Sequence, residues 1–231
     1  MMTALDTVGR ALVTGISSGI GAAIGRLLLD AGWSVIGLSR TAPAWRHDRL
    51  TFVATDIADT RGFAKALVDL PQVDAIFHAA GVLRVGAIGA QSLDDGRIMW
   101  RLHVEAPIQL IEHLVPQMPE GGRIVLIGSR TASGAAGRAQ YAASKAALTG
   151  LARSWAQELA PRRITVNIVA PAATDTPMLR DPARSTLPPR LPPMGRFVDP
   201  SEVAALALFL VSPGAASITG QQIVMCAGSS L

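Results

Sequence analysis

The segment YAASK, residues 141–145, contains the only tyrosine of the chain and one of its two lysines. Residues four apart lie on the same face of an α-helix, so we expect Tyr141 and Lys145 to point into the same cleft. A phenol has an ordinary pKa of about 10, and a neighbouring ammonium lowers that pKa because it stabilises the phenolate. The pair can then exchange a proton with an alcohol or a carbonyl near neutral pH. The alternative is a tyrosine that packs on a helix beside a lysine without any chemical role.

A glycine-rich turn lies near the start of the chain, in the segment RALVTGISSGIG. A short apolar run leads into Gly15, Gly19 and Gly21, and a helical pattern follows. Glycines allow the backbone to turn tightly and to approach a pyrophosphate, whose charge is favourable at a helix N-terminus. Ser17 and Ser18 add hydroxyl donors for phosphate oxygens. The pattern predicts a dinucleotide site, and a tight strand-to-helix connection without a ligand is the alternative.

Several motifs resemble those of one enzyme family. TGISSGIG, with the spacing G-x-x-x-G-x-G, resembles the cofactor signature of the short-chain dehydrogenase/reductase family, and Tyr-x-x-x-Lys is that family's catalytic motif. FHAAG resembles the family's N-N-A-G after the fourth strand, and ITVNIVAPAATDTPM resembles its strand-six segment. MGRFVDPSEVA and SITGQQIVMCAG resemble its closing elements. The resemblance covers essentially the whole chain and implies an oxidoreductase that uses a nicotinamide cofactor.

The resemblance also implies roles for individual residues. Tyr141 supplies or removes the proton, and Lys145 hydrogen-bonds the nicotinamide ribose, a task that suits a compact ammonium better than a planar guanidinium. Ser129, at the end of RIVLIGS, corresponds to the serine that holds the substrate oxygen. It lies twelve residues before Tyr141, whereas the family most often has thirteen, so Ser133 is a competing candidate. Cofactor contacts are expected at Gly15, Ser17, Ser18, Gly19, Ile20, Gly21, Ser39, Arg40, Asp56, Ile57, Ala80, Gly81, Tyr141, Lys145, Pro171, Thr174 and Thr176.

Some positions depart from the family pattern. His103, in MWRLHVEAP, stands where the family has an asparagine that holds a water in the proton relay. Histidine can donate, accept or carry a proton near neutral pH, so His103 either takes over the relay or satisfies the same local helix distortion. We include it among the catalytic candidates. His78 and Ala79 replace the asparagines of N-N-A-G, which brace the sheet and the cofactor pocket, so we expect His78 to be structural.

The end of the second expected strand, VIGLSR, indicates which nicotinamide cofactor binds. A carboxylate at this position would bind the adenosine ribose hydroxyls and select NAD. Ser39 and Arg40 stand there instead, so no carboxylate repels a 2′-phosphate and the arginine can pair with it. We therefore expect NADP, with NAD the less favoured cofactor. An arginine that is simply exposed at a strand end is the alternative.

Short apolar runs alternate with longer helical patterns along the chain. This alternation predicts an α/β fold of the Rossmann type, a doubly wound and mostly parallel seven-stranded sheet with helices on both faces. Strands are expected at Arg10–Thr14, Trp33–Leu38, Leu50–Thr55, Val73–His78, Gly122–Gly128, Ile164–Ala170 and Gln222–Met225. Helices are expected at Ile20–Asp30, Thr60–Leu70, Leu93–Val115, Ala139–Leu159 and Ser201–Leu210.

One long irregular segment, residues 174–200, contains seven prolines. Irregular segments of this length are uncommon inside compact domains unless they have a function. The segment follows a strand end, where ligands bind in open α/β sheets, so we expect a lid that covers the substrate. A disordered excursion is the alternative.

Length and composition favour a single domain over residues 1–231, because 49% hydrophobic content suits one substantial core. The net charge of +4 comes from scattered arginines, and the 4% aromatic content offers no stacking platform, which argues against nucleic acid. A single cysteine, Cys226, suits a reducing cytoplasm. We recognise no secretory signal, no membrane-spanning run and no metal-ligand spacing.

We therefore expect an NADP(H)-dependent oxidoreductase that interconverts a small-molecule ketone and a secondary alcohol, acting as a carbonyl reductase. A 3-oxoacyl-carrier-protein reductase is one alternative. Such an enzyme binds its acidic carrier through arginines near the cleft, and Arg162 could serve, although Glu120 stands where a basic residue would help. A cofactor-sensing protein without turnover is the other alternative. The family resemblance also implies a homodimer or homotetramer built on the two long helices.

Overall fold

The computed structural model describes residues 8–182 and 187–231. Within these residues, seven strands form one sheet in the order β3-β2-β1-β4-β5-β6-β7, and each neighbouring pair is parallel. The predicted doubly wound α/β fold is therefore confirmed. The strands are β1 Arg10–Thr14, β2 Ser34–Ser39, β3 Leu50–Ala54, β4 Ala75–His78, β5 Arg123–Ile127, β6 Thr165–Pro171 and β7 Gln222–Met225.

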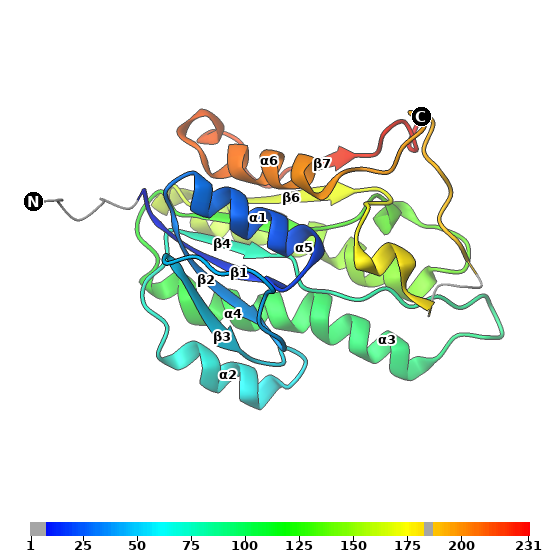
Figure 1. Ribbon diagram of the computed structural model, residues 1–231, viewed down its shortest axis with the longest axis horizontal. Coiled ribbons are helices and arrows are strands. Elements are labelled where there is room, and N and C mark those ends of the chain that lie inside the picture. The colour runs from blue at the N-terminus through cyan, green and yellow to red at the C-terminus, as the bar shows by residue number, and fades with distance from the viewer. Residues whose placement is uncertain (1–7, 183–186) are drawn as a thin grey trace, which may run out of the picture.

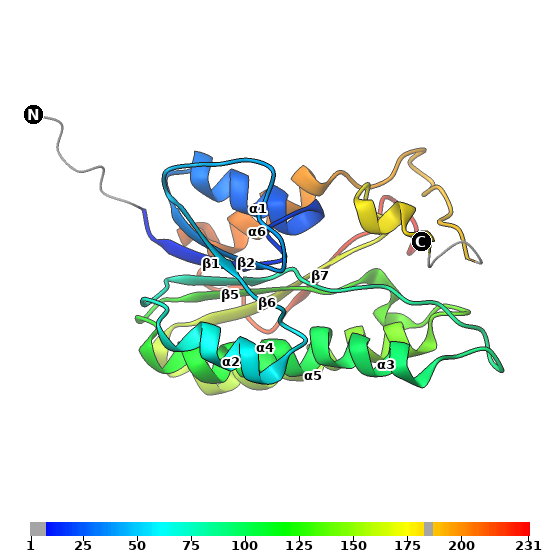
Figure 2. The same cartoon turned by 60° about the horizontal axis from the view of Figure 1, so that its bottom comes forward.

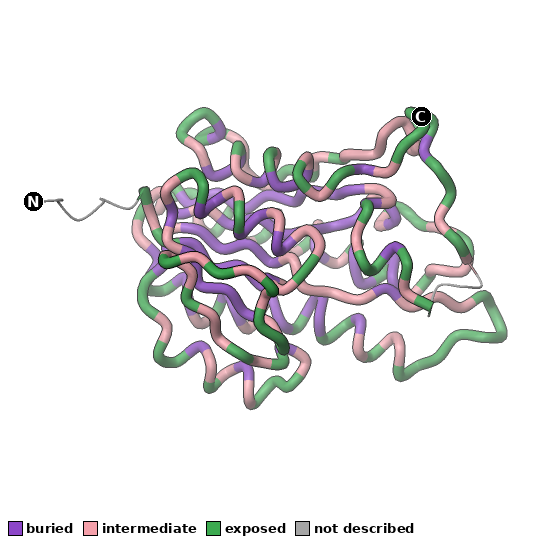
Figure 3. The backbone as a smooth tube through the Cα atoms, viewed as in Figure 1, coloured by how far each residue is buried: buried purple, intermediate pink, exposed green. Residues whose placement is uncertain are grey.

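Helices cover both faces of the sheet (Figures 1 and 2). Helices α1 and α6 pack together on one face, and α2, α4 and α5 lie on the other. Each layer encloses its own group of buried apolar side chains. Figure 3 shows that buried residues are concentrated along the central strands. The α-helices are α1 Gly19–Asp30, α2 Thr60–Val68, α3 Leu93–Trp100, α4 Ala106–Leu114, α5 Ala139–Leu159 and α6 Pro200–Val211. Shorter turns are η1 Arg101–Glu105, η2 Val115–Gln117, η3 Arg130–Ser133, η4 Ala160–Arg162, η5 Pro177–Arg180 and η7 Pro213–Ala215.

The strand order reverses direction at β1, which pairs with β2 on one side and with β4 on the other. In open α/β sheets, ligands bind outside the carboxyl ends of the strands at such a switch point. Thr14, the last residue of β1, lies opposite Leu38 of β2 and His78 of β4. The loops that follow β1 and β4 therefore meet at the position where a nucleotide is expected.

The predicted helical stretch Leu93–Val115 is helical throughout, but a π-helical turn, η1, interrupts its α-helical hydrogen bonding between α3 and α4. The backbone N–H of Ala106 donates to the carbonyl of Arg101, five residues earlier. A π-turn inserts one extra residue and changes which side chains face the core. Three consecutive residues of this turn, Leu102, His103 and Val104, are buried as a result. The other predicted strand and helix bounds agree with the structure to within two residues.

Helix α5 follows its prediction, and its alanine-rich sequence favours a long helix. Its buried residues recur every three or four positions, so one face packs against the sheet. Tyr141 and Lys145 lie on this buried face, one turn apart near the start of the helix. Packing of α5 against β6 and against η3 positions both side chains at the carboxyl edge of the sheet.

In the predicted lid segment, residues 174–200, residues 183–186 lie outside the described residues, and the described residues are mostly irregular and include the turn η5. Its two ends meet in a parallel bridge between Thr174 and Val198. Asp175 N–H donates to Val198 O at 2.9 Å, which closes the base of the segment. Whether the segment covers a substrate remains a prediction.

Candidate active site

The turn between β1 and α1 is built around three glycines. Gly15 and Gly19 have positive φ angles of 75° and 55°, which glycine adopts at little cost. A Cβ at Gly21 would lie 2.3 Å from the carbonyl oxygen of Gly15, so any larger residue would push the turn apart. The turn can therefore bring backbone N–H groups close to a ligand, as the sequence predicted.

The N-terminus of α1 is suited to an anion. Ser18 is the N-cap residue, but its side chain makes no capping hydrogen bond, and no acidic residue stands in the first turn. The first N–H groups of a helix have no partner within the helix, and the helix dipole favours negative charge there. Ser17, Ser18 and Ile20 of the same turn are partly or fully exposed, so they border open space beside this helix end.

Two separate loops converge on the glycine turn. A Cβ at Gly15 would lie 3.1 Å from Ala80, in the loop after β4. A Cβ at Gly19 would lie 3.2 Å from the Cγ2 of Thr176, in the loop after β6. These close approaches bring together residues predicted to bind one cofactor from the first, fourth and sixth strands. Pro171 ends β6, and Thr174 follows it, with its hydroxyl donating to the carbonyl of Ala172 at 3.0 Å.

Tyr141 and Lys145 are both buried, with 8% and 5% of their surfaces exposed. The Lys145 amine donates to the carbonyl of Ile127, at the end of β5, at 2.8 Å. Burial lowers the pKa of Lys145 to about 7. A lysine whose pKa lies near neutrality responds strongly to any charge placed beside it. No carboxylate forms an ion pair with Lys145 among the residues that the structure describes.

The loop after β4 borders this lysine. A Cβ at Gly81 would lie 2.7 Å from Nε2 of His103 and 3.8 Å from Nζ of Lys145. Only glycine leaves room for the His103 ring at this point. Gly81 therefore lies beside Lys145 of α5, while its neighbour Ala80 touches the glycine turn. The predicted catalytic and cofactor-binding residues thus form one continuous region.

His103 is fully buried, and both of its ring nitrogens have partners. The backbone N–H of Val82 donates to Nε2 at 3.3 Å, so the ring proton is on Nδ1, which donates to Ser144 Oγ at 2.9 Å. Ser144 donates in turn to the carbonyl of Tyr141 at 2.9 Å. Burial, assisted by the charge of Lys145, lowers the pKa of His103 well below its ordinary value. The ring of His103 also meets the ring of Tyr141 edge-on, with centroids 5.5 Å apart.

His78 is buried at the end of β4, as expected for a structural residue. Its Nδ1 lies 3.0 Å from the hydroxyl of Thr14, and its Nε2 lies 2.9 Å from the carbonyl of Leu102. Burial, with a smaller contribution from the charge of Lys145, lowers the pKa of His78 to about 3. The ring is therefore neutral at physiological pH.

The two serine candidates differ in burial. Ser129 is 7% exposed and stands at the N-cap of η3, where its Oγ accepts from the N–H of Thr131 at 3.1 Å. Its hydroxyl hydrogen has no acceptor within residues 8–182 and 187–231, so it can donate to a ligand. Ser133 is exposed, and its hydroxyl donates to the carbonyl of Arg130 at 3.1 Å. The geometry thus favours Ser129 over Ser133 as the substrate-binding hydroxyl.

The residues predicted to bind the adenosine half follow β2 and β3. Arg40 is exposed, and the described residues provide no ion pair for it. The hydroxyl of Ser39 donates to the carbonyl of Thr41 at 2.7 Å, so this serine shapes the loop. Asp56 accepts from the N–H of Ala58, whereas the side chain of Ile57 packs into the core. Arg40 is thus the one basic side chain of this group, and it is free to meet an anion.

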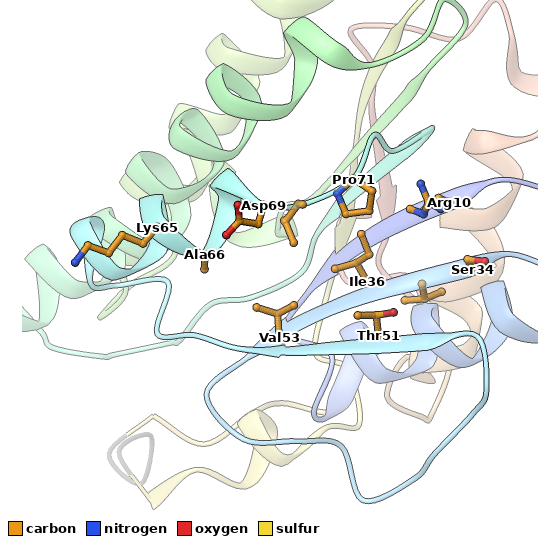
Figure 4. A pocket seen from close by; sticks show the side chains of 11 residues that line it. Arg10, Ser34, Ile36, Thr51, Val53, Lys65, Ala66, Asp69 and Pro71 are labelled. Atoms are coloured by element: carbon orange, nitrogen blue, oxygen red, sulfur yellow. The ribbon is translucent and has the colours of Figure 1, made fainter.

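Two hollows in the surface lie at different positions relative to the candidate active site. One, of about 540 Å³, is lined in part by Asp56 and lies near the expected adenine position. The other, of about 470 Å³, lies between the end of α2 and the first residues of β1 and β2 (Figure 4). Lys65, Arg10 and Ser34 are among its lining residues. None of the predicted site residues lines this second hollow, so it is separate from the candidate active site.

Arg84 connects the irregular segment to the rest of the site. Its guanidinium lies 3.3 Å from a carboxylate oxygen of Asp181 and 3.6 Å from one of Asp95 at the start of α3. A second contact is apolar, because a Cβ at Gly137 would meet the Cδ1 of Leu187 at 2.2 Å. The segment therefore packs onto the loop that precedes Tyr141.

Arg162, which the sequence suggested only as an arginine that could bind an acidic carrier, does not lie near the cleft. Its guanidinium donates to the carbonyl of Val115 at 2.9 Å and to that of Met118, just before β6 begins. This is the amino-terminal edge of the sheet, opposite to the edge where the glycine turn lies. Glu120 is at the same edge, paired with Arg163. Arg162 therefore does not border the cleft of its own chain.

Sequence reasoning missed two polar residues that organise the site. Ser144 lies within YAASK itself and links His103 to Tyr141. Thr14 directly precedes the glycine turn, and its hydroxyl accepts from the N–H groups of Ala79 and Ala80, both at 3.1 Å. Each is a small hydroxyl residue within a motif quoted above, TGISSGIG or YAASK, but no role was predicted for either. Within the described residues, no cluster of three or more potential metal ligands occurs, and none of the helices could cross a bilayer.

Several known proteins are similar to this chain over nearly its whole length. It is 34% identical over 229 residues to the 3-oxoacyl-[acyl-carrier-protein] reductase FabG of Vibrio cholerae, covering 92% of this chain and 93% of that protein. It is 35% identical over 218 residues to the cyclic-di-GMP-binding biofilm dispersal mediator protein of Escherichia coli, covering 90% and 92%. It is 34% identical over 241 residues to the 2,3-dihydro-2,3-dihydroxybenzoate dehydrogenase of Escherichia coli, covering 95% and 96%.

Solved structures agree with these sequence relations. A short-chain dehydrogenase family protein of Francisella tularensis superposes with a TM-score of 0.89 at 28% identity, covering 96% of this chain and 98% of that one. A short-chain dehydrogenase of Burkholderia cenocepacia, in complex with NADP, superposes with a TM-score of 0.86 at 32% identity, covering 99% and 100%. A family model described as enoyl-(acyl carrier protein) reductase matches residues 15–230. With the glycine turn, the Tyr141–Lys145 pair and the fold in agreement, this chain belongs to the short-chain dehydrogenase/reductase family of oxidoreductases.

Proposed function

We propose that this oxidoreductase uses NADPH to reduce the carbonyl group of a small molecule to a secondary alcohol. The observation that carries the proposal is the buried Tyr141–Lys145 pair, which borders the loop that touches the glycine turn. Burial strengthens electrostatic effects between charged and polar groups, so a tyrosine here can be tuned by its surroundings.

The residues present fit a dinucleotide. The glycine turn is so tight that a Cβ at Gly21 would clash with the Gly15 carbonyl. The uncapped start of α1 beside this turn suits a pyrophosphate. Arg40, exposed and without an ion pair among the described residues, would hold a 2′-phosphate. Similar proteins support NADP over NAD, because the Burkholderia structure contains NADP and another neighbour, BdcA, contains NADPH.

The bound cofactor would supply a hydride to the carbonyl carbon, and this chain would supply the proton and hold the substrate. Tyr141 donates its phenolic proton to the carbonyl oxygen as the carbon gains the hydride. Ser129 donates a hydrogen bond to the same oxygen and stabilises the charge that develops on it. Lys145 holds the ribose and stabilises the phenolate that Tyr141 leaves behind. The overall reaction consumes one carbonyl, one NADPH and one proton.

His103 acts in this proposal as a neutral brace. Both ring nitrogens are engaged by Val82 and Ser144, and its pKa is well below the range in which it would carry a proton. A group that relays protons needs a pKa near the working pH. The geometry therefore favours the second of the two roles that the sequence left open.

The test is turnover of NADPH with a panel of ketones, diketones and 3-oxoacyl thioesters, followed by loss of NADPH absorbance. Tyr141→Phe should reduce turnover by about 10²–10⁴-fold, because it removes the proton donor. NADPH affinity, measured by fluorescence, should stay within about threefold in this variant because the glycine turn is unchanged. A Tyr141→Phe protein with full turnover would reject the mechanism.

Two other functions remain separable by the same measurements. Similarity to FabG of Vibrio cholerae supports a 3-oxoacyl-carrier-protein substrate, which would react while free ketones of similar size would not. Similarity to the cyclic-di-GMP-binding protein of Escherichia coli supports a binding protein instead. That function predicts NADPH binding with no turnover on any carbonyl in the panel.

A further inference from the structure

The π-turn between α3 and α4 leaves one carbonyl without a backbone donor. In a regular α-helix the carbonyl of Leu102 would accept from Ala106, but that N–H donates to Arg101 instead. In the π-helical pattern its donor would be residue 107, and Pro107 has no N–H. Leu102 is buried, and a buried carbonyl without a partner is destabilising. His78 provides the missing donor, since its Nε2 lies 2.9 Å from the Leu102 oxygen.

Thr14 determines which nitrogen of His78 carries the proton. The Thr14 oxygen accepts from the N–H groups of both Ala79 and Ala80, so its own hydrogen is left to donate to Nδ1 of His78. A carbonyl can only accept, so the contact with Leu102 independently requires the proton on Nε2. Both partners select the same tautomer. The ring of His78 therefore joins the end of β1 to the π-turn through two directed hydrogen bonds.

The next residue after this carbonyl is His103. Its ring reaches Val82 on one side and Ser144 on the other, and Ser144 bonds the carbonyl of Tyr141. A shift of the π-turn by one residue would carry His103 away from all these partners. We propose that His78 is a positioning residue, which fixes the π-turn and thereby holds His103 against the helix that carries Tyr141.

This inference predicts a spectroscopic signature that needs no substrate. Nitrogen chemical shifts of the imidazole rings should show His78 protonated on Nε2 and His103 protonated on Nδ1. Neither ring should take up a second proton between about pH 5 and about pH 8, the range in which an ordinary histidine titrates. Histidine-to-glutamine variants at each position, with His113→Gln as the surface control, assign the signals.

The decisive comparison is His78→Leu against His78→Gln. Leucine has no donor for the Leu102 carbonyl, so the signals of His103 should move and its ring should begin to titrate in that range. The glutamine amide can still donate, so the signals of His103 should stay close to those of the unmodified protein. Unchanged His103 signals in a cooperatively folded His78→Leu protein would overturn the inference. If His78→Leu does not fold, Thr14→Val can be compared with Thr14→Ser instead. Valine removes the hydroxyl that bonds Nδ1 of His78, and serine keeps it.

Kinetics add a second readout, which rests on the proposed function. His78→Leu should lower kcat about tenfold to a hundredfold, as expected when a supporting group lets a site shift, and His78→Gln should recover most of the loss. The NADPH dissociation constant should change by less than about threefold in both variants. An effect on kcat without an effect on cofactor binding indicates a positioning role. A parallel loss of NADPH affinity would overturn the inference by assigning His78 to the cofactor pocket. Absence of turnover in the unmodified protein would reject the proposed function while leaving the spectroscopic test intact.

Discussion

Replacing Lys145 by methionine should make the ligand-free protein more stable at neutral pH, although it should abolish turnover. The Lys145 amine is buried, and the described residues offer it no carboxylate partner. Burial lowers its pKa from 10.5 to about 7, because the surroundings disfavour the charged form. Methionine has a similar length and can occupy the same space without a charge. The stability difference between the two proteins therefore measures the cost of keeping this lysine.

The sign and size follow from proton linkage. Because the folded-state pKa is lower than the unfolded-state pKa, the unfolded chain binds more protons between pH 10.5 and about 7, and stability falls as the pH falls through this window. The shift corresponds to a destabilisation of about 4 kcal/mol at pH 7 and about 2 kcal/mol at pH 9. Methionine also loses the hydrogen bond to Ile127, which offsets about 1 kcal/mol. The net gain is about 3 kcal/mol at pH 7 and about 1 kcal/mol at pH 9.

Thermal unfolding at several pH values checks this prediction. For a chain of this size, 1 kcal/mol corresponds to about 2–4 °C, so Lys145→Met should raise Tm by about 6–12 °C at pH 7 and by about 2–4 °C at pH 9. Lys65→Met is a matched control, because Lys65 is the only other lysine and is exposed on α2. The control should change stability by less than about 0.5 kcal/mol at every pH. A Lys145→Met effect that is destabilising, or that is equal at both pH values, would refute the reasoning.

Three further predictions concern the cofactor and substrate. Gly21→Ala should weaken NADPH binding about tenfold or more, because its Cβ would clash with the backbone, while Gly150→Ala, in open space on α5, should stabilise the protein by about 0.5–1 kcal/mol. Equal NADPH affinities in the two variants would contradict the proposal that NADPH binds at the glycine turn. Arg40→Asp should reverse the ratio of kcat/KM for NADPH over NADH, since a carboxylate repels the 2′-phosphate, and an unchanged ratio would remove Arg40 from the site. Ser129→Ala should lower kcat about 10²–10³-fold, and a comparable loss in Ser133→Ala instead would transfer the role to that residue.

The strands were predictable because each is a local pattern. Parallel strands buried on both faces read as short apolar runs, and the seven runs agree with the structure to within two residues. The π-turn inside the helix over 93–115 was not predicted, because the helical sequence pattern continues on both sides of it. A one-residue insertion in the hydrogen-bond ladder leaves no mark in composition. Only the Ala106–Arg101 bond reveals that α3 and α4 are separate.

The candidate site was partly predictable because some of its motifs are also local sequence patterns. The glycine turn and the Tyr141–Lys145 pair each lie within a few residues of sequence, so their spacing is informative. Arg162 illustrates the opposite case. Its charge made it a candidate for carrier binding, but a residue that precedes a parallel strand lies at the amino edge of the sheet, and the structure places Arg162 there, beside Val115 and away from the cleft.

The amino-acid sequence by itself determined the parallel α/β fold, the glycine turn and the placement of a tyrosine and a lysine on one helical face, because these depend on neighbours along the chain. The tertiary structure decided how far burial lowers the pKa of His103 and of Lys145. His103 is neutral because it is enclosed and bonded to Ser144, 41 residues away. Lys145 has a pKa near 7 because packing removes water from it and offers only the Ile127 carbonyl in exchange. Burial is a property of the whole fold, and the charge of a buried group follows from it.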